Sequence, residues 1–344
     1  MKTKKITKKT FSQPNAGEII LNLVRQSAEI SDDCKIELFD LPNAMDVLLE
    51  YLRHGGKLDA EMCFEFYDNM WNKVYKLPNT EEFVLELAKQ GITFAYCFQD
   101  EIFRLPNAEK IFLEYAKHGG FIHGEALAKI CEFPTAEKIV LEQAKQGRFP
   151  RFFTELEKKI TQLNNAGEIF LEYAKHGCSF STEIQKKIAH LDNAEKIFLE
   201  YAKHGGWFCD EVQNEILNFG NPGKIFLEYA KHGGWICDQV LLDIFDFLHS
   251  EEIFLEYVKH HKWINDEMQD LIYTLSNGKE IILEYVMHGG RVSDDFQYMI
   301  FELPNAPEMV LEYARHHPLC KNVKAEISKL PNAEEIFTEL KKFA

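Results

Sequence analysis

The stretch IFLEYAKHGG at residues 111–120 recurs throughout the chain and decides its fold. It returns letter for letter at 197–206 and 225–234, and with one substitution at 169–178. More divergent copies are VLLEYLRHGG (47–56), FVLELAKQGI (83–92), IFLEYVKHHK (253–262), IILEYVMHGG (281–290) and MVLEYARHHP (309–318). Internal similarity at a period of 20–50 residues is typical of tandem repeat proteins.

Most copies follow an LPNAEK-like segment, whose Asn, or the residue that replaces it, we take as the first place of a repeat. Repeats then begin at residues 15, 43, 79, 107, 135, 165, 193, 221, 249, 277, 305 and 332, mostly 28 residues apart. Because such repeats bury their apolar faces against their neighbours, we predict a single helical-repeat domain over 15–344. The lysine-rich residues 1–14 are expected to form a basic tail.

The repeat at 107–134 predicts a helical hairpin. Asn107 is a suitable N-cap, because its side-chain oxygen can accept a hydrogen bond from an amide of the first turn. Apolar side chains between 108 and 116 share one face at helical spacing. Glycine accepts the left-handed conformation that ends helices, so Gly119-Gly120 marks the end of this first helix, which is expected to span about eleven residues.

A second helix of about ten residues is expected after the glycine pair. Its apolar stripe is Val212, Ile216 and Phe219 in one repeat, at spacings of four and three residues. Two adjacent places change freely between repeats, from Gln213 and Asn214 to Leu241 and Leu242 and then to Gln269 and Asp270. We therefore expect these places to point outward and the second helices to line a recognition surface.

Two repeats depart from the regular length. The repeat at 43–78 gains eight residues, which predicts a second helix about two turns longer than its neighbours. The repeat at 135–164 gains two residues around 148–151, where a local kink is expected.

These features predict an all-α fold, a right-handed α-solenoid of about eleven two-helix repeats with a C-terminal capping helix from residue 332. The layout over 15–344 resembles the α-solenoid superclass of tetratricopeptide, Sel1-like and HEAT-like arrays, in architecture only, since the repeat is shorter than the 34 residues of a tetratricopeptide. The resemblance implies a scaffold that binds proteins or peptides.

Composition limits the location and the partners. The net charge is −16 over 344 residues, which disfavours nucleic-acid backbones and anionic lipids and suits a basic or amphipathic partner. Eight cysteines without a CxxC pair indicate reduced thiols. No apolar run approaches the roughly 18 residues of a membrane span, and the N-terminal lysines precede no apolar segment of a signal peptide. We expect a cytoplasmic protein outside the membrane.

Catalytic signatures are absent from the sequence, which has no Walker loop, GxSxG, HExxH or paired-cysteine motif. We therefore expect a non-enzymatic scaffold without cofactor or metal that mediates protein or peptide binding. The alternative is a modular nucleic-acid-binding protein that reads one base per repeat, against which the net acidity argues.

A Tyr–His pair three residues apart recurs at the end of the first helix. It comprises Tyr51–His54, Tyr115–His118, Tyr173–His176, Tyr201–His204, Tyr229–His232, Tyr257–His260, Tyr285–His288 and Tyr313–His316. Packed helices lie about 8–10 Å apart, whereas Zn–N bonds are about 2.0–2.1 Å long, so adjacent histidines are poorly placed to share an ion. We expect a phenol–imidazole contact that is structural.

Large aromatic side chains are the candidate binding residues. The fifteenth place, just after the glycine pair, carries Phe121, Trp207, Trp235 and Trp263, and the long repeat adds Phe64, Tyr67 and Trp71. Serine and arginine occupy the fifteenth place elsewhere, at Ser179 and Arg291. Either the rings wedge between hairpins, which we favour, or they form a row that contacts a partner. The aromatic cluster of the long repeat is expected to form a partner-binding patch.

Overall fold

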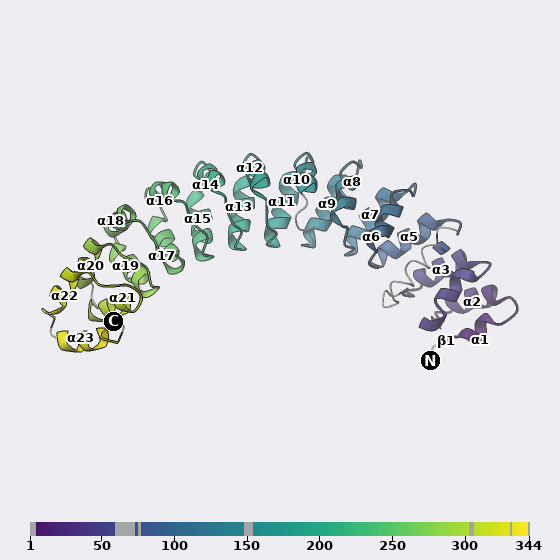
Figure 1. Cartoon of the computed structure of the whole chain (residues 1–344). Coiled ribbons are helices and arrows are strands. Elements are labelled where there is room, and N and C mark those ends of the chain that lie inside the picture. The colour runs from purple at the N-terminus through teal and green to yellow at the C-terminus, as the bar shows by residue number, and fades with distance from the viewer. Residues whose placement is uncertain are drawn as a thin grey trace. The chain divides into compact units, whose positions relative to one another are not determined.

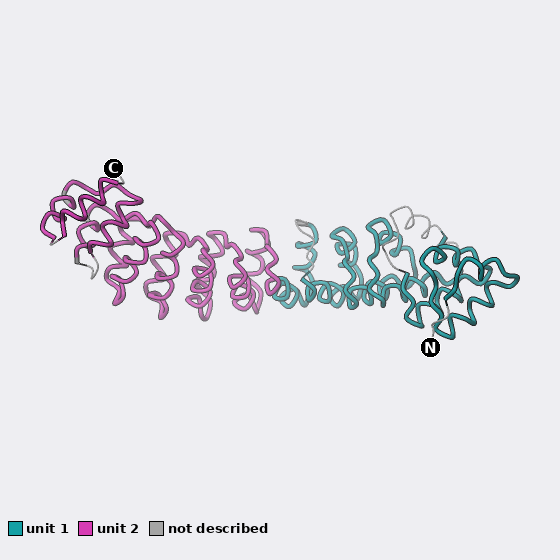
Figure 2. Tube along the Cα trace, turned by 90° about the horizontal axis from the view of Figure 1, so that it is seen from below, with its two compact units in different colours: residues 1–173 teal, residues 174–344 magenta. Residues whose placement is uncertain are grey.

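The computed structural model describes residues 5–58, 73–74, 77–147, 154–302, 306–330 and 332–342. It divides into two compact halves, residues 1–173 and 174–344, coloured separately in Figure 2. The N-terminal half contains β1 (Lys5–Ile6), α1 (Lys8–Phe11), α2 (Ala16–Arg25), β2 (Glu29–Ile30), η1 (Asp32–Cys34), η2 (Ile36–Asp40), α3 (Ala44–Arg53), α5 (Thr80–Lys89), α6 (Tyr96–Ile102), α7 (Ala108–Lys117), α8 (Gly124–Ile130), α9 (Ala136–Lys145), α10 (Thr154–Ile160) and the start of α11 (Ala166–Lys175).

The C-terminal half continues the alternation of first and second helices. It contains α12 (Thr182–Ile188), α13 (Ala194–Lys203), α14 (Asp210–Ile216), α15 (Pro222–Lys231), α16 (Asp238–Ile244), α17 (Ser250–His260), α18 (Asp266–Thr274), α19 (Gly278–Met287), α20 (Asp294–Met299), η3 (Ile300–Glu302), α21 (Ala306–His316), α22 (Lys321–Ile327) and α23 (Ala333–Leu340). The predicted α-solenoid of helical repeats is confirmed.

First helices pack on first helices and second helices on second helices. Within the C-terminal half, α13, α15 and α17 form one layer and α14, α16 and α18 the other (Figure 1). The apolar face predicted for the first helix is confirmed, since Ile111, Phe112 and Tyr115 are fully buried. Burying this face against the neighbouring repeats removes apolar surface from water, the main favourable term in folding.

The glycine pair ends the first helix as predicted. Gly205, for example, adopts a φ of 71°, in the left-handed region that favours glycine. Two repeats carry His261 and His317 at this place instead. There α17 and α21 run one residue further than the ten residues of a regular first helix such as α13.

The predicted capping role of the asparagine is wrong for the type repeat. Asn107 precedes α7, but its side chain caps no amide, and its Oδ1 atom is buried without a hydrogen-bond partner. At the same place Asn165 turns toward the preceding repeat, where its Nδ2 donates to the carbonyl of Glu137 at 3.2 Å. Among the described asparagines that precede a first helix, one caps an amide with its side chain. This is Asn221, next to Pro222, which accepts a hydrogen bond from the amide of Lys224 at 3.4 Å.

The second helices are shorter than predicted. Helix α14 spans seven residues and ends at Ile216, and Phe219 of the predicted stripe lies in the turn that follows. The reason is that this turn carries the chain back to the next first helix, with the amide of Phe219 donating to the carbonyl of Ile216 at 3.0 Å. The apolar spacing of Val212, Ile216 and Phe219 therefore extends past the end of the helix and into the turn.

The N-terminal residues differ from the expected tail. From Lys5 onward they belong to the first repeat, because β1 pairs in parallel with β2 and Ile6 is fully buried. Helix α1 packs against α2. In place of a second α-helix, this repeat has the 3₁₀ helices η1 and η2.

Two expectations lie outside the described residues. The longer second helix of the repeat at 43–78, with Phe64, Tyr67 and Trp71, falls within 59–72 and 75–76, and the kink expected at 148–151 falls within 148–153. In the part of the chain that is described, no helix combines the length and the apolar character needed to span a membrane.

Buried glutamines in the second helices join consecutive repeats. The Nε2 of Gln213 donates to the carbonyl of Phe208 in its own loop at 3.3 Å and to that of Trp235 in the next repeat at 2.8 Å. Its Oε1 accepts from the amide of Cys237 at 2.9 Å. The same three bonds are made by Gln99, Gln185 and Gln269. We call this arrangement the glutamine clamp.

The clamp overturns the expectation of an outward orientation at the first of these places, whereas Asn214 and Asp270 at the second place are exposed as expected. Gln213, Leu241 and Gln269 are all buried, so they contribute to packing between repeats and not to a recognition surface. The change from glutamine to leucine had suggested a free surface, but both side chains fill the same interior place. A glutamine that recurs at one place in several repeats was the signal that could have revealed the clamp.

We predict that replacing Gln213 by alanine destabilises this part of the array by about 1–3 kcal/mol, the cost of leaving a buried polar group unpaired. Denaturant unfolding and amide exchange at Cys237 measure the effect. The neighbouring Asn214 is exposed, so Asn214→Ala is the matched control and should cost under about 0.5 kcal/mol. Equal effects of the two substitutions would contradict the clamp.

Candidate functional site: an exposed tryptophan row

Three tryptophans occupy equivalent loops in the C-terminal half. Trp207, Trp235 and Trp263 follow α13, α15 and α17 and have exposed fractions of 55%, 43% and 55%. We call them the tryptophan row. Phe121, at the same place in the N-terminal half, is 37% exposed. These rings are too exposed to be wedged fully between hairpins, although that of Trp235 also contacts Tyr257 and His261 of the next repeat.

The indoles point outward because the loop is extended and alternates between its two sides. Phe208 follows Trp207 and is fully buried, with its ring centroid 5.5 Å from that of Phe198 and 4.6 Å from that of Tyr229. Ile236, the residue after Trp235, is also fully buried. In an extended chain successive side chains point in opposite directions, so the inward anchor directs the tryptophan to solvent.

The glutamine clamp holds the backbone on both sides of two of these residues. Gln185 bonds the carbonyl of Trp207 at 2.8 Å and the amide of Cys209 at 3.1 Å. Gln213 does the same for Trp235 and Cys237. The two indoles are therefore carried by backbone that is fixed by buried hydrogen bonds.

Trp263 is held differently, because the preceding repeat has Leu241 at the clamp place. Here the side-chain amide of Asn265 donates to Oδ2 of Asp238 at 3.2 Å. The amide of Arg291 donates to the carbonyl of Lys262 at 3.1 Å, and Trp263 and Arg291 form a parallel bridge. The loop of Trp263 is thus joined to the repeats on both sides.

Trp235 contacts the half-buried imidazole of His261 in the next repeat. The ring of His261 lies edge-on to Trp235 at 5.3 Å and stacks on Tyr257 at 4.0 Å, and its Nε2 is 3.1 Å from the carbonyl oxygen of Gly234. Burial lowers the pKa of His261, although the bond to Gly234 acts in the opposite direction. A neutral imidazole therefore supports one side of Trp235.

The Tyr–His pairs are structural, but by contacts other than the expected one. Tyr115 is buried and its hydroxyl accepts from the amide of Phe94 in the preceding repeat at 2.9 Å. His118 is exposed and its Nδ1 lies 2.9 Å from the carbonyl oxygen of Glu114, in its own helix. Burial raises the pKa of the equivalent Tyr229 to about 12. The tyrosine thus joins repeats, whereas the histidine completes a helix end.

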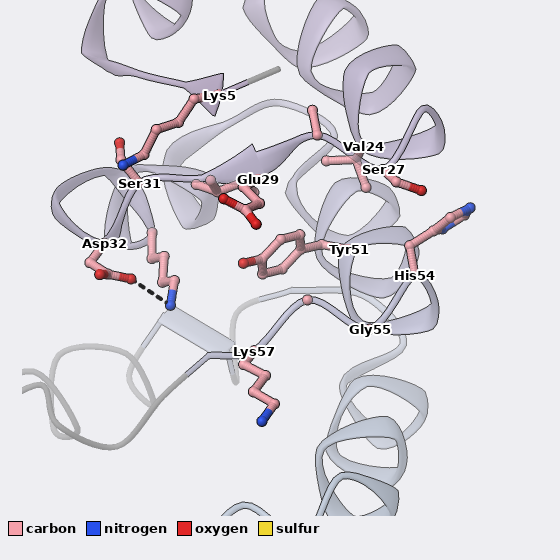
Figure 3. Close-up of a pocket in the computed structure, with 14 residues that line it drawn as sticks. Lys5, Val24, Ser27, Glu29, Ser31, Asp32, Tyr51, His54, Gly55 and Lys57 are labelled. Carbon is pink, nitrogen blue, oxygen red and sulfur yellow. Dashed lines mark ion pairs between the residues drawn. The ribbon is translucent and has the colours of Figure 1, made fainter. Parts of the chain in front are cut away.

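A polar pocket of about 420 Å³ lies in the first two repeats (Figure 3). Glu29, Asp32 and Tyr51 surround it, and Lys35 enters its wall with a side chain that is almost fully buried. The ammonium of Lys35 lies 2.8 Å from Asp32, and this bond lowers the pKa of the Asp32 carboxyl. Lys35 occupies the place in its repeat that Gln213 occupies in the glutamine clamp. We therefore interpret Lys35 as a packing residue.

The described residues contain no group of three His, Cys, Asp or Glu side chains arranged to hold a metal ion. In comparisons with known proteins, no protein-family model matches the chain, and the curated proteins give no match either.

The exposure of the row predicts a contrast between two adjacent residues. Trp207→Ala should cost under about 1 kcal/mol of stability, as expected for a half-exposed side chain. Phe208→Ala, at the buried neighbour, should cost about 3–5 kcal/mol. Denaturant unfolding of the two variants measures both values. A loss of several kcal/mol for Trp207→Ala would show that its ring is a packing element.

The lowered pKa of His261 predicts a stability that depends on pH. Below about pH 6.5 the unfolded chain binds a proton at this imidazole that the folded protein resists. The stabilisation is present above that pH and is lost as the pH falls through the folded-state pKa. The free energy of unfolding should therefore drop more from about pH 7.5 to about pH 5.5 in the wild type than in His261→Gln. Equal drops would contradict the assignment.

Proposed function

We propose that this chain is a non-enzymatic, cytoplasmic helical-repeat scaffold that binds a protein or extended peptide through the tryptophan row. The observation that carries the proposal is that three large indoles in consecutive repeats are half-exposed on one kind of loop. Exposed aromatic side chains in soluble proteins tend to mark interfaces. Tryptophan is also enriched among the residues that dominate binding energies.

The fixed backbone beneath the row supports this role. A surface whose loops are already ordered loses less conformational freedom on binding, which favours affinity. The clamp bonds of Gln185 and Gln213 provide that order for Trp207 and Trp235. Stacking between repeats does not itself require the indoles, because the exposed Ser179 and Arg291 occupy the same place in the flanking repeats.

The remaining properties of the proposed partner follow from charge and sequence. A net charge of −16 favours a basic or amphipathic partner. Phe121 occupies the same exposed place in the N-terminal half and is proposed to contribute in the same way. The cysteines within the described residues are free thiols, which agrees with a reducing compartment such as the cytoplasm.

A random-peptide display library tests the proposal. Peptides selected on the wild type should fail to bind a variant in which Trp207, Trp235 and Trp263 are all serine, the residue that Ser179 already places next to the row. The single Trp235→Ser change should weaken binding more than tenfold, or about 1.4 kcal/mol.

Arg291→Ser is the matched control, since it changes the same exposed place outside the row and should leave binding within about threefold. Enrichment of no peptide, or equal binding by the triple variant, would overturn the proposed function.

A further inference from the structure

Exposed aspartates accompany the tryptophan row. The first residue of the second helix is Asp210, Asp238 and Asp266 in the three repeats that carry the row. The repeat before them has Thr182 at this place. The repeat after them also has an aspartate, Asp294, although Arg291 occupies its fifteenth place. The last second helix, α22, begins with Lys321. Every indole of the row is therefore followed three residues later by an aspartate, within a run of four repeats that share this aspartate.

Helix capping alone does not require these aspartates. An acidic residue in the first turn interacts favourably with the helix dipole, yet the equivalent helices α8 and α12 begin with Gly124 and Thr182. The favourable term is also small at an exposed site, about 0.3–1 kcal/mol. The fold thus accepts other residues where these repeats place a carboxylate.

The aspartates lie at the junctions between successive members of the row. Oδ2 of Asp238 is 3.2 Å from the side-chain amide of Asn265, which follows Trp263 by two residues. Asp210 is near enough to Tyr229 of the next repeat to add to the effect of burial in raising the pKa of that phenol to about 12. Asp210 and Asp238 therefore each lie near a residue of the following repeat.

The carboxylates of this set are available to a ligand. Asp210, Asp238 and Asp266 are exposed and make no ion pair within the described part of the chain. By contrast, the adjacent Glu211 is engaged by Lys186 at 2.9 Å, and this contact lowers the pKa of Glu211. The negative charge at the junctions is therefore not neutralised by the protein itself.

Indole faces and free carboxylates share one preferred partner, a Lys or Arg side chain. A cation is attracted to the face of an indole, and guanidinium forms strong charge-assisted hydrogen bonds with carboxylates. Adjacent helices pack about 8–10 Å apart. A polyproline II segment has three residues per turn and advances about 3.1 Å per residue, so every third side chain lies on the same face. One repeat therefore matches one three-residue turn of a polyproline II peptide.

We infer that the row and its aspartates bind a segment in the polyproline II conformation that presents a Lys or Arg side chain at every third residue, one to each repeat. The inference rests on the proposed function and specifies its partner. The negative charge of the surroundings and the repeat spacing together favour this partner over an apolar helix, which would present side chains at a different interval.

Two synthetic peptides test the inference. One carries three arginines separated by two alanines each, and the other has the same composition with the arginines consecutive. In titrations followed by isothermal calorimetry, the spaced peptide should bind the wild type at least tenfold more tightly than the consecutive one. Equal affinities would overturn the matching of three residues to one repeat.

Charge variants separate a specific site from general attraction. Replacing Asp210, Asp238 and Asp266 by asparagine should weaken the spaced peptide at least tenfold. The control variant replaces Asp243, Asp246 and Asp270, exposed aspartates beyond the first turn of the second helices, and removes the same charge. It should weaken binding less than threefold. Equal losses in the two variants would show only net-charge attraction and would overturn the inference.

The display library distinguishes the inference from the proposed function. If the library yields peptides that need the tryptophans but lack basic residues, the proposed function stands and the inference fails. If peptides that depend on the row carry arginine or lysine at intervals of three, both are supported. If no peptide depends on the tryptophans, both fail.

Discussion

The hydrogen bonds that cross from one repeat to the next are the constraint on which the rest of the structure depends. The loop between the helices of each hairpin is partly buried, so its amides and carbonyls need partners. A buried carboxamide such as that of Gln213 supplies a donor to two carbonyls and an acceptor to one amide. Buried tyrosine hydroxyls, such as that of Tyr115, satisfy another amide.

This constraint also creates the surface where we place function. The inward side of each loop is fixed by residues such as Phe208 and by the clamp, whereas the outward side is largely exposed. The outward place can therefore change from Ser179 to Trp207 without altering the hairpin. The array separates a repeated structural interior from a variable exterior, and the tryptophans and aspartates of three adjacent repeats are where that exterior is most distinctive.

The period and the buried face of the first helix could be predicted from sequence, because they follow from apolar spacing that the structure preserves at Ile111, Phe112 and Tyr115. The role of Asn107 could not, since an N-cap preference is local and the Oδ1 atom of this side chain is buried without a hydrogen-bond partner. Gln213 appeared to be a surface residue because polarity alone does not reveal a buried hydrogen-bonded side chain. The exposure of the indoles depends on the buried residue that follows each of them in an extended loop, such as Phe208 after Trp207. The apolar spacing of helices does not predict side-chain directions in such a loop.

Nuclear magnetic resonance of the indole N–H groups tests most directly whether the row acts as one surface. On titration with the arginine-spaced peptide, the signals of Trp207, Trp235 and Trp263 should move together and saturate at the same peptide concentration. The account is contradicted if these three signals stay in place while other signals of the protein respond, or if they saturate at widely different concentrations.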